Sequence, residues 1–164
     1  MSDPVFRIES VDVADPRAVA LRGILDDDLG ERYRDADADD SPEFAAKREA
    51  ALAVHPEQVV ATLVAVDADD TPLGHVMLRR LGDEWELKRL IVVAAARRRG
   101  VGRALTADVV DLARRAGARR VILQSGRMQP ESLRMYAASG FTPIPVYEPY
   151  VETMPRSLCF EYVF

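Results

Sequence analysis

The stretch that decides the fold runs Leu87-Lys-Arg-Leu-Ile-Val-Val-Ala-Ala-Ala-Arg-Arg-Arg-Gly-Val-Gly-Arg-Ala-Leu105. An apolar strand leads here through a basic turn into a helix. Gly100 and Gly102 let the backbone approach a ligand closely, and the free N–H groups and dipole of a helix start favour negative charge. Four arginines add fixed positive charge around the turn: Arg97, Arg98, Arg99 and Arg103. The pattern predicts a binding site for a pyrophosphate.

Two other phosphate-binding patterns do not fit this turn. The dinucleotide fingerprint needs a third glycine at the position of Leu105. The loop that binds nucleoside triphosphates needs Gly-Lys-Ser/Thr at the helix start, and the turn lacks that tripeptide. The sequence therefore disfavours a dinucleotide, ATP or GTP as the ligand.

Hydrophobic periodicity outside this stretch predicts a sheet flanked by helices. Strands are expected over 5–10, 59–66, 73–81, 84–93, 120–124, 141–146 and 158–163. Helices are expected from Asp15-Pro16, from Ser41-Pro42 to about Val54, over 101–116 and over 130–138. The apolar stripe of the first helix is expected to consist of Leu21, Ile24, Leu25 and Leu29. Hairpins followed by a strand–helix–strand crossover indicate an α/β protein of the α+β type, with a mixed, mostly antiparallel sheet of about six to seven strands.

Composition indicates one domain over residues 1–164, with 48% hydrophobic and 30% charged residues. The start, Met1-Ser-Asp-Pro-Val-Phe6, lacks the pattern of a secretory signal, and no apolar run reaches about 20 residues. We therefore expect a cytoplasmic location and no membrane partner. The net charge of −5 argues against nucleic acid as a partner.

A second motif, Gln129-Pro-Glu-Ser-Leu-Arg-Met-Tyr-Ala-Ala-Ser-Gly-Phe141, follows the basic loop at a distance of one helix and one strand. Together the two motifs resemble the coenzyme A site of the GNAT N-acetyltransferase superfamily. Ala94 stands where that family commonly has proline, Arg98 where it has glycine, and Ser132 where it has alanine. The resemblance covers the chain from Leu87 to Phe141.

This resemblance implies a GNAT-like sheet with a splay between the fourth and fifth strands, and acetyl-CoA as the cofactor. It assigns the pantetheine arm to the backbone of Leu90, Ile91 and Val92. The pyrophosphate is assigned to Arg97, Arg98, Arg99, Gly100, Val101, Gly102, Arg103 and Ala104. Gln129, Ser132 and Tyr136 complete the expected cofactor contacts.

The implied reaction is the transfer of an acetyl group to a primary amine by direct attack. Tyr136 is the candidate general acid for the departing sulfur, because a phenol is protonated at neutral pH. Glu86 is the best candidate for the base, and Glu84 or a water molecule are alternatives. A module that binds coenzyme A or acyl-CoA without catalysis is the alternative function.

The acceptor is not specified by a motif, although a small molecule is expected. Glu84, Tyr147 and Tyr150 are candidates for acceptor binding, and a plain surface turn explains the two tyrosines equally well. The acidic segments 26–28 and 35–40 favour a cationic acceptor. His55 and His75 lack clustered partners, so we expect no metal. The resemblance is also compatible with a homodimer.

Overall fold

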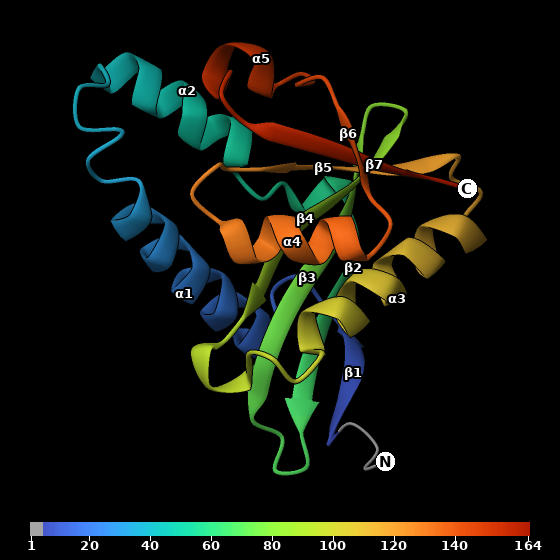
Figure 1. Ribbon diagram of the computed structural model, residues 1–164. Helices are drawn as coiled ribbons and strands as arrows, with labels where there is room; N and C mark the ends of the chain where they lie inside the picture. Colours follow the sequence, from blue (N-terminus) through green and yellow to red (C-terminus); the bar gives the residue numbers. More distant parts are fainter. Residues whose placement is uncertain (1–4) are drawn as a thin grey trace.

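The fold is built around one seven-stranded sheet, as the computed structural model of residues 5–164 shows (Figure 1). The first four residues, part of the start that predicts no secretory signal, lie outside the described residues. The strands are β1 Phe6–Val11, β2 Val59–Asp67, β3 Pro72–Leu81, β4 Glu84–Val92, β5 Arg120–Ser125, β6 Thr142–Ile144 and β7 Leu158–Val163. Their order is β1-β2-β3-β4-β5-β7-β6, and only β4 and β5 pair in parallel. The predicted mixed, mostly antiparallel sheet is confirmed.

The helices begin where the sequence places their caps. They are α1 Pro16–Arg32, α2 Pro42–Leu52, α3 Val101–Arg115, α4 Pro130–Ala138 and the short α5 Tyr150–Thr153, with single 3₁₀ turns at Pro56–Gln58 and Ala94–Ala96. The Asp15 carboxylate accepts the Arg17 N–H, and the Ser41 hydroxyl accepts the Phe44 N–H, so both helix starts are satisfied. The predicted strand over 141–146 shortens to β6, which ends just before Pro145, a residue without the N–H that a ladder requires.

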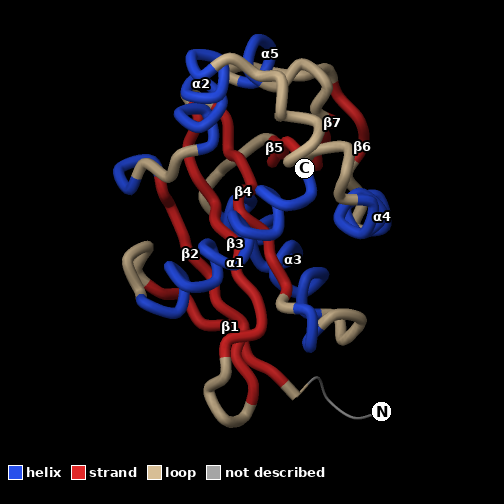
Figure 2. The backbone as a smooth tube through the Cα atoms, turned by 90° about the vertical axis from the view of Figure 1, so that its left-hand side faces the viewer, coloured by secondary structure: helices blue, strands red, loops and turns tan. Residues whose placement is uncertain are grey.

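Helices α1 and α3 cover opposite faces of the sheet, as alternate residues of β2 show. Leu63 packs in the core that includes α3, whereas Val64 packs in the core that includes α1. Figure 1 shows α1 to the left of β2 and β3 and α3 to the right, and Figure 2 views the strands from the side of α1. Leu21 and Leu25 carry the packing of α1, while Ile24 is 49% exposed. The prediction that Ile24 belongs to the buried stripe is wrong, since it points off the face that meets the sheet.

Strands β4 and β5 separate soon after they meet. Their pairing is confined to Glu86 with Ile122 and Leu87 with Leu123, while β4 continues to Val92. The predicted splay between the fourth and fifth strands is confirmed. From Lys88 onward, the edge of β4 opposite β3 therefore has no strand beside it.

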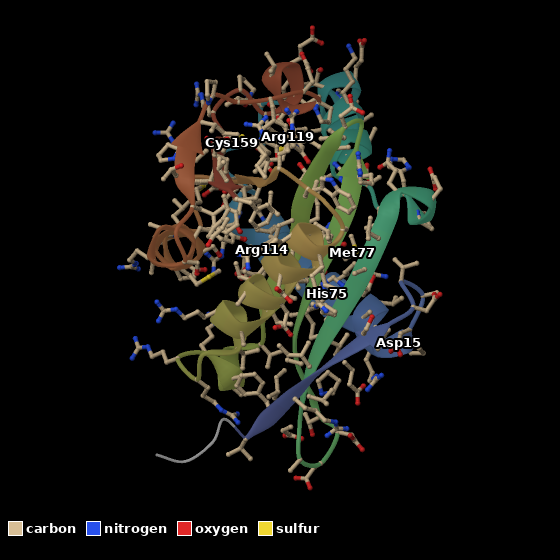
Figure 3. The ribbon with its side chains drawn as sticks, turned by 90° about the vertical axis from the view of Figure 1, so that its right-hand side faces the viewer. Asp15, His75, Met77, Arg114, Arg119 and Cys159 are labelled. Atoms are coloured by element: carbon tan, nitrogen blue, oxygen red, sulfur yellow. The ribbon has the colours of Figure 1, made fainter. Side chains whose placement is uncertain are left out.

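A bulge in β4, which the sequence does not predict, occurs at the same point. Between the partners of His75 and Met77 on β3 (Figure 3), β4 has one extra residue. Arg89 takes a left-handed conformation there, with φ +56°. The bulge reverses the alternation of the strand, so that Leu90 joins Leu87 in the core beneath α3.

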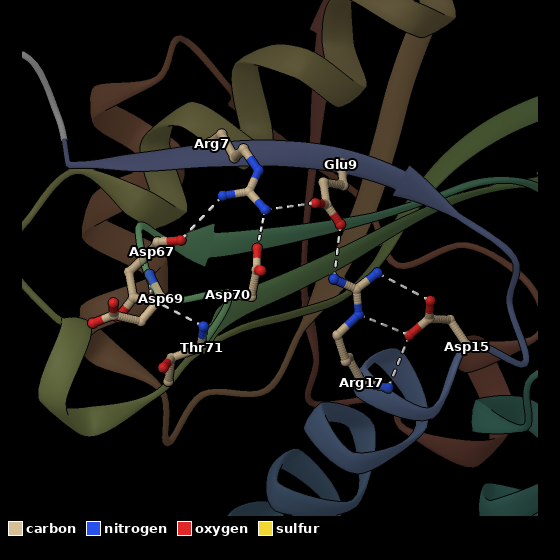
Figure 4. A network of polar contacts seen from close by, with 8 residues as sticks. All are labelled: Arg7, Glu9, Asp15, Arg17, Asp67, Asp69, Asp70 and Thr71. Atoms are coloured by element: carbon tan, nitrogen blue, oxygen red, sulfur yellow. Dashed lines mark hydrogen bonds and ion pairs between the residues drawn. The ribbon is translucent and has the colours of Figure 1, made fainter.

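A surface network of charged side chains ties β1 to its neighbours (Figure 4). Arg7 pairs with Asp70 in the β2–β3 turn, and Glu9 accepts a hydrogen bond from Arg17 of α1 at 2.8 Å. These groups are solvent-exposed or half-exposed, so water and salt screen each pair and its contribution to stability is small. The network lies at the β1 edge of the sheet, away from the opening between β4 and β5.

Candidate functional site

The basic loop forms an open helix start beside the end of β4. Gly100 is the N-cap of α3 with φ +81°, and no side chain caps the first turn. The backbone N–H groups in the first turn of α3 therefore have no partner within the helix. Arg98 also takes a left-handed conformation, with φ +64°, so it keeps the backbone shape that glycine adopts more easily. Arg97, Arg98 and Arg99 are exposed. The loop fits a pyrophosphate.

Close packing of α3 on the sheet requires glycine at its second residue. A Cβ atom on Gly102 would lie 3.3 Å from Cγ2 of Val92 in β4. On β3, a Cβ atom on Gly74 would lie 2.9 Å from the Ile91 carbonyl oxygen. The glycines thus let the helix start approach the strand whose edge is open.

A cavity of about 950 Å³ lies along this open edge. Helices α1 and α2, the loop after β5 and the loop before β7 supply its walls. Of the predicted cofactor residues, Leu90, Gln129 and Tyr136 line the cavity. The other predicted cofactor residues, the basic loop among them, lie outside its lining.

Tyr136 is held by aromatic packing on the inner side of α4. Its ring centroid lies 5.9 Å from that of Phe141 and 6.5 Å from that of Phe160. The residue is 6% exposed. Burial raises the pKa of the Tyr136 hydroxyl well above its usual value, so the group remains protonated at neutral pH.

Glu86 lies in a closed cluster of hydrogen bonds rather than in the cavity. Its Oε1 accepts a hydrogen bond from Nε of Arg79 at 2.6 Å. Its Oε2 accepts the hydroxyls of Tyr147 at 2.6 Å and Tyr150 at 3.0 Å. The residue is fully buried and is not part of the cavity lining. In this geometry both carboxylate oxygens already have partners and neither belongs to the cavity lining, which weighs against the prediction that Glu86 is the base.

The residues predicted to bind the acceptor occupy other places. Tyr150 is fully buried in α5 and Tyr147 is half-buried, which weighs against the alternative of a plain surface turn. Both tyrosines hold Glu86 instead. Glu84 accepts a hydrogen bond from Arg120 at 3.1 Å. None of the three lines the cavity.

Lys88 lines the cavity, although the sequence did not mark it. It follows Glu86 on the same face of β4, is 7% exposed, and lies with its ammonium 4.7 Å from the ring centroid of Tyr150. Burial lowers the pKa of Lys88 to about 8. A single lysine in a strand is typical of a solvated surface. The one sequence signal that could have identified Lys88 is its position two residues after Glu86, which puts both side chains on the same face.

The acidic residues of the cavity are paired with arginines. Asp26 pairs with Arg89, and both Asp37, at 3.3 Å, and Asp40 pair with Arg48. Two arginines thus compensate most of the charge of three carboxylates. This pairing weakens the expectation that the acidic segments favour a cationic acceptor.

The structure also bears on metals and membranes. Among residues 5–164, no three His, Cys, Asp or Glu side chains come together as a metal-binding group. No helix in this part of the chain has both the length and the apolar character needed to cross a membrane.

The fold and the loop together define the class of GNAT-type acetyltransferases. The sequence profile described as "Acetyltransferase (GNAT) family" matches residues 19–141. The chain belongs to this family. It is 36% identical over 84 residues to N-acetyltransferase 8 of Mus musculus, a match that covers 51% of this chain. The chain spans only about a third (34%) of that relative's length.

Solved structures share the fold along nearly the whole chain. A Klebsiella pneumoniae protein assigned as an acyl-CoA N-acyltransferase superposes with a TM-score of 0.75 and 20% identity, covering 98% of this chain and 99% of that one. PaiA N-acetyltransferase from Thermoplasma acidophilum, solved in complex with coenzyme A, superposes with a TM-score of 0.66 and 16% identity over 100% of both chains.

Proposed function

We propose that the chain transfers an acetyl group from acetyl-CoA to a primary amine of a small molecule by direct attack. The observation that carries the proposal is the open edge of β4, which ends beside the uncapped, arginine-rich start of α3. Pantetheine amides can hydrogen-bond along such an edge, and a helix start binds a pyrophosphate. PaiA N-acetyltransferase, which has this fold, binds coenzyme A.

The residues that would hold acetyl-CoA come from three segments. The backbone of Leu90–Val92 offers N–H and C=O groups to the pantetheine arm, and residues 97–104 surround the pyrophosphate. Gln129 and Ser132 at the start of α4 extend the site toward the cavity. When bound, acetyl-CoA supplies a thioester whose carbonyl carbon is attacked by the amine.

Tyr136 would donate the proton that the leaving sulfur needs. The C–N bond forms as the C–S bond breaks, so the sulfur must gain a proton and the amine nitrogen must lose one. Tyr136 lines the cavity, and its hydroxyl stays protonated because burial raises its pKa. The N–H of Val92 would polarise the thioester carbonyl.

We assign the proton from the amine to water in the cavity. Glu86 and Glu84 do not line the cavity, and its three aspartates are paired with arginines. Glu86 is a positioning residue in this scheme, because it holds Tyr147, Tyr150 and Arg79 together.

A turnover screen across amine classes, following free thiol release from acetyl-CoA, tests the function. Direct attack predicts that initial-rate lines intersect when both substrates are varied, whereas a covalent acetyl-enzyme predicts parallel lines. Acetyl-CoA binding without turnover of any amine would instead favour the alternative, a module that binds acyl-CoA without catalysis.

Replacing Tyr136 with Phe tests the general acid. The variant keeps the ring that packs on Phe141 and Phe160 but removes the proton donor. We expect kcat to fall about 100-fold while the dissociation constant for acetyl-CoA stays nearly unchanged. Steady-state kinetics and calorimetry measure the two quantities. Unchanged kcat would remove Tyr136 from the mechanism.

A further inference from the structure

We propose that the acceptor amine also carries a carboxylate, as an amino acid does, and that the ammonium of Lys88 binds this carboxylate. The inference rests on the proposed function, since it names the substrate class of the same site. It follows from the charges that line the cavity and from the partners that each charge has within the chain.

Lys88 is a buried cation without an anionic partner in direct contact. Among residues 5–164 it forms no ion pair and no side-chain hydrogen bond. The nearest carboxylate along the strand, Glu86, already pairs with Arg79 at 2.6 Å. An ammonium that is largely withdrawn from water and has no hydrogen-bond acceptor in the chain is costly, because its N–H donors keep little contact with solvent. Because Lys88 lines the cavity, a ligand there can supply the missing acceptor.

The ring of Tyr150 does not replace such an acceptor. The Lys88 ammonium lies 4.7 Å from its centroid, so the ring face attracts the charge but accepts no conventional hydrogen bond. The same contact means that this ring face is already taken by a cation of the chain. A cationic acceptor therefore cannot use the Tyr150 ring in this arrangement.

The charges that line the cavity are positive on balance. Asp26 is paired with Arg89, while Asp37 and Asp40 share Arg48. Arg127 and Arg156, both exposed at the cavity, make no ion pair within the described part of the chain. With five cations and three carboxylates in the lining, the net charge of the cavity is positive, which favours a ligand that brings an anion.

The walls of the cavity suit an apolar side chain on that amino acid. Aliphatic, aromatic and thioether groups from α1, α2 and the loop before β7 face it: Leu25, Leu29, Phe44, Leu52 and Met154. Apolar lining with a few polar groups that fix orientation is typical of small-molecule sites. An amino acid with a large apolar side chain matches both features.

Three acceptors with one side chain test the proposal. L-Phenylalanine, L-phenylalaninamide and phenethylamine each carry a primary amine, but only the first has a carboxylate. We expect kcat/KM for phenylalanine to exceed that for the other two by at least about tenfold, the effect of one charge-assisted hydrogen bond. Equal or higher kcat/KM for the amide and phenethylamine would overturn the proposal while leaving the acetyltransferase activity standing. No turnover of any amine would count against the proposed function instead.

Variants of Lys88 connect the preference to this residue. In Lys88→Met the ratio of kcat/KM for phenylalanine to that for the amide should fall to near one, and Lys88→Arg should restore part of it. Arg119→Gln is the matched control, since Arg119 is exposed at the other end of β5 and forms no ion pair among the described residues. The KM for acetyl-CoA should stay within about twofold in all three. A ratio that survives Lys88→Met, or a KM for acetyl-CoA that rises with it, contradicts the assignment.

A binding measurement supplies a readout that does not depend on turnover. Titration of N-acetyl-L-phenylalanine into the protein saturated with coenzyme A should give at least about tenfold weaker binding for Lys88→Met than for the wild type. Should Lys88→Met fail to fold, Arg156→Gln at the exposed rim serves as the second variant, with an expected loss of roughly threefold. Unchanged affinity in the variant that folds would overturn the role of the cavity cations.

Discussion

Glu86 and Lys88 lie two positions apart on one face of β4 and differ in the partners that the fold supplies. Arg79 lies beside Glu86 on β3, and its guanidinium compensates the carboxylate. Met77 lies beside Lys88 and offers it no charge. On this strand the Glu86 carboxylate is fully paired within the protein and stabilises the fold. The Lys88 ammonium has no anionic partner in the described part of the chain and is available to a ligand.

The segment after β6 contributes to both regions in different ways. Tyr147 and Tyr150 donate hydroxyls to Glu86, whereas Lys88 receives only the ring face of Tyr150. His75, on the same face of β3, is saturated like Glu86, because its two ring nitrogens contact the Arg89 carbonyl oxygen at 2.8 Å and Arg22 at 3.1 Å. Burial lowers the pKa of His75 to about 4, so it is neutral at physiological pH. Of the three titratable side chains Glu86, His75 and Lys88, only Lys88 has no hydrogen-bond partner among the described residues.

The largest effect on stability is expected when the hydrogen-bonded cluster around Glu86 is disrupted. Glu86→Gln keeps an oxygen for the tyrosine hydroxyls but leaves the buried Arg79 guanidinium without its counter-charge. We expect the free energy of unfolding to fall by about 3 kcal/mol, as for other buried pairs that lose one partner. Chemical denaturation measures the change.

Glu84→Gln is the matched control for this prediction, because its pair with Arg120 is partly exposed. That substitution should cost less than about 1 kcal/mol. Similar losses in the free energy of unfolding for the two variants would show that the buried cluster around Glu86 stabilises the fold no more than a partly exposed ion pair does.

The unpaired ammonium of Lys88 predicts that ligand binding depends on pH. The pKa of Lys88 is lowered to about 8 chiefly by burial, so the ammonium is lost as the pH rises through that value. The groups that face it are Arg79, Glu86, Arg89, Cys159 and Tyr150. Burial raises the pKa of Cys159 and of Tyr150, so neither becomes charged near pH 8. The affinity for N-acetyl-L-phenylalanine, which has no titrating amine, should fall by about tenfold per pH unit above about pH 8.

Isothermal titration across this range checks the pH prediction. Lys88→Arg should bind with an affinity independent of pH there, since an arginine keeps its charge. A wild-type affinity that does not change with pH would mean that the Lys88 ammonium does not contact the carboxylate.

The smallest effect is expected on the stability of the Lys88→Met variant, and its sign is opposite to that for Glu86. A lysine whose pKa is lowered by folding opposes folding at pH values below the lowered pKa, and this cost disappears as the pH rises toward the unfolded value near 10.5. The variant should therefore gain about 1 kcal/mol at neutral pH, after the lost contact with Tyr150 is subtracted.

Denaturation at neutral and at alkaline pH checks this gain. The difference between variant and wild type should shrink at alkaline pH. A loss of stability at neutral pH would show that Lys88 is satisfied within the chain and has no need of a ligand.

The helix starts and the turn between β4 and α3 were largely predictable because their signals are local. The caps at Asp15 and Ser41, the helix start at Gly100 and the strand of apolar residues before it depend on neighbours a few positions away. The bulge at Arg89 was not predictable, because no local residue requires it and only pairing with β3 reveals the extra position.

The sequence by itself determined the strands, the starts of α1 to α4, the glycine turn before α3 and the family resemblance, since these follow from periodicity and short-range spacing. Only the tertiary structure decided what each charge does. The carboxylate of Glu86 is enclosed by tyrosines that follow it by 61 and 64 positions, and the aspartates of the cavity are paired with Arg48 and Arg89. Lys88 is left without an anion because no carboxylate is brought to it. A charge acquires its role from the partners that folding places beside it, and those partners are distant in sequence.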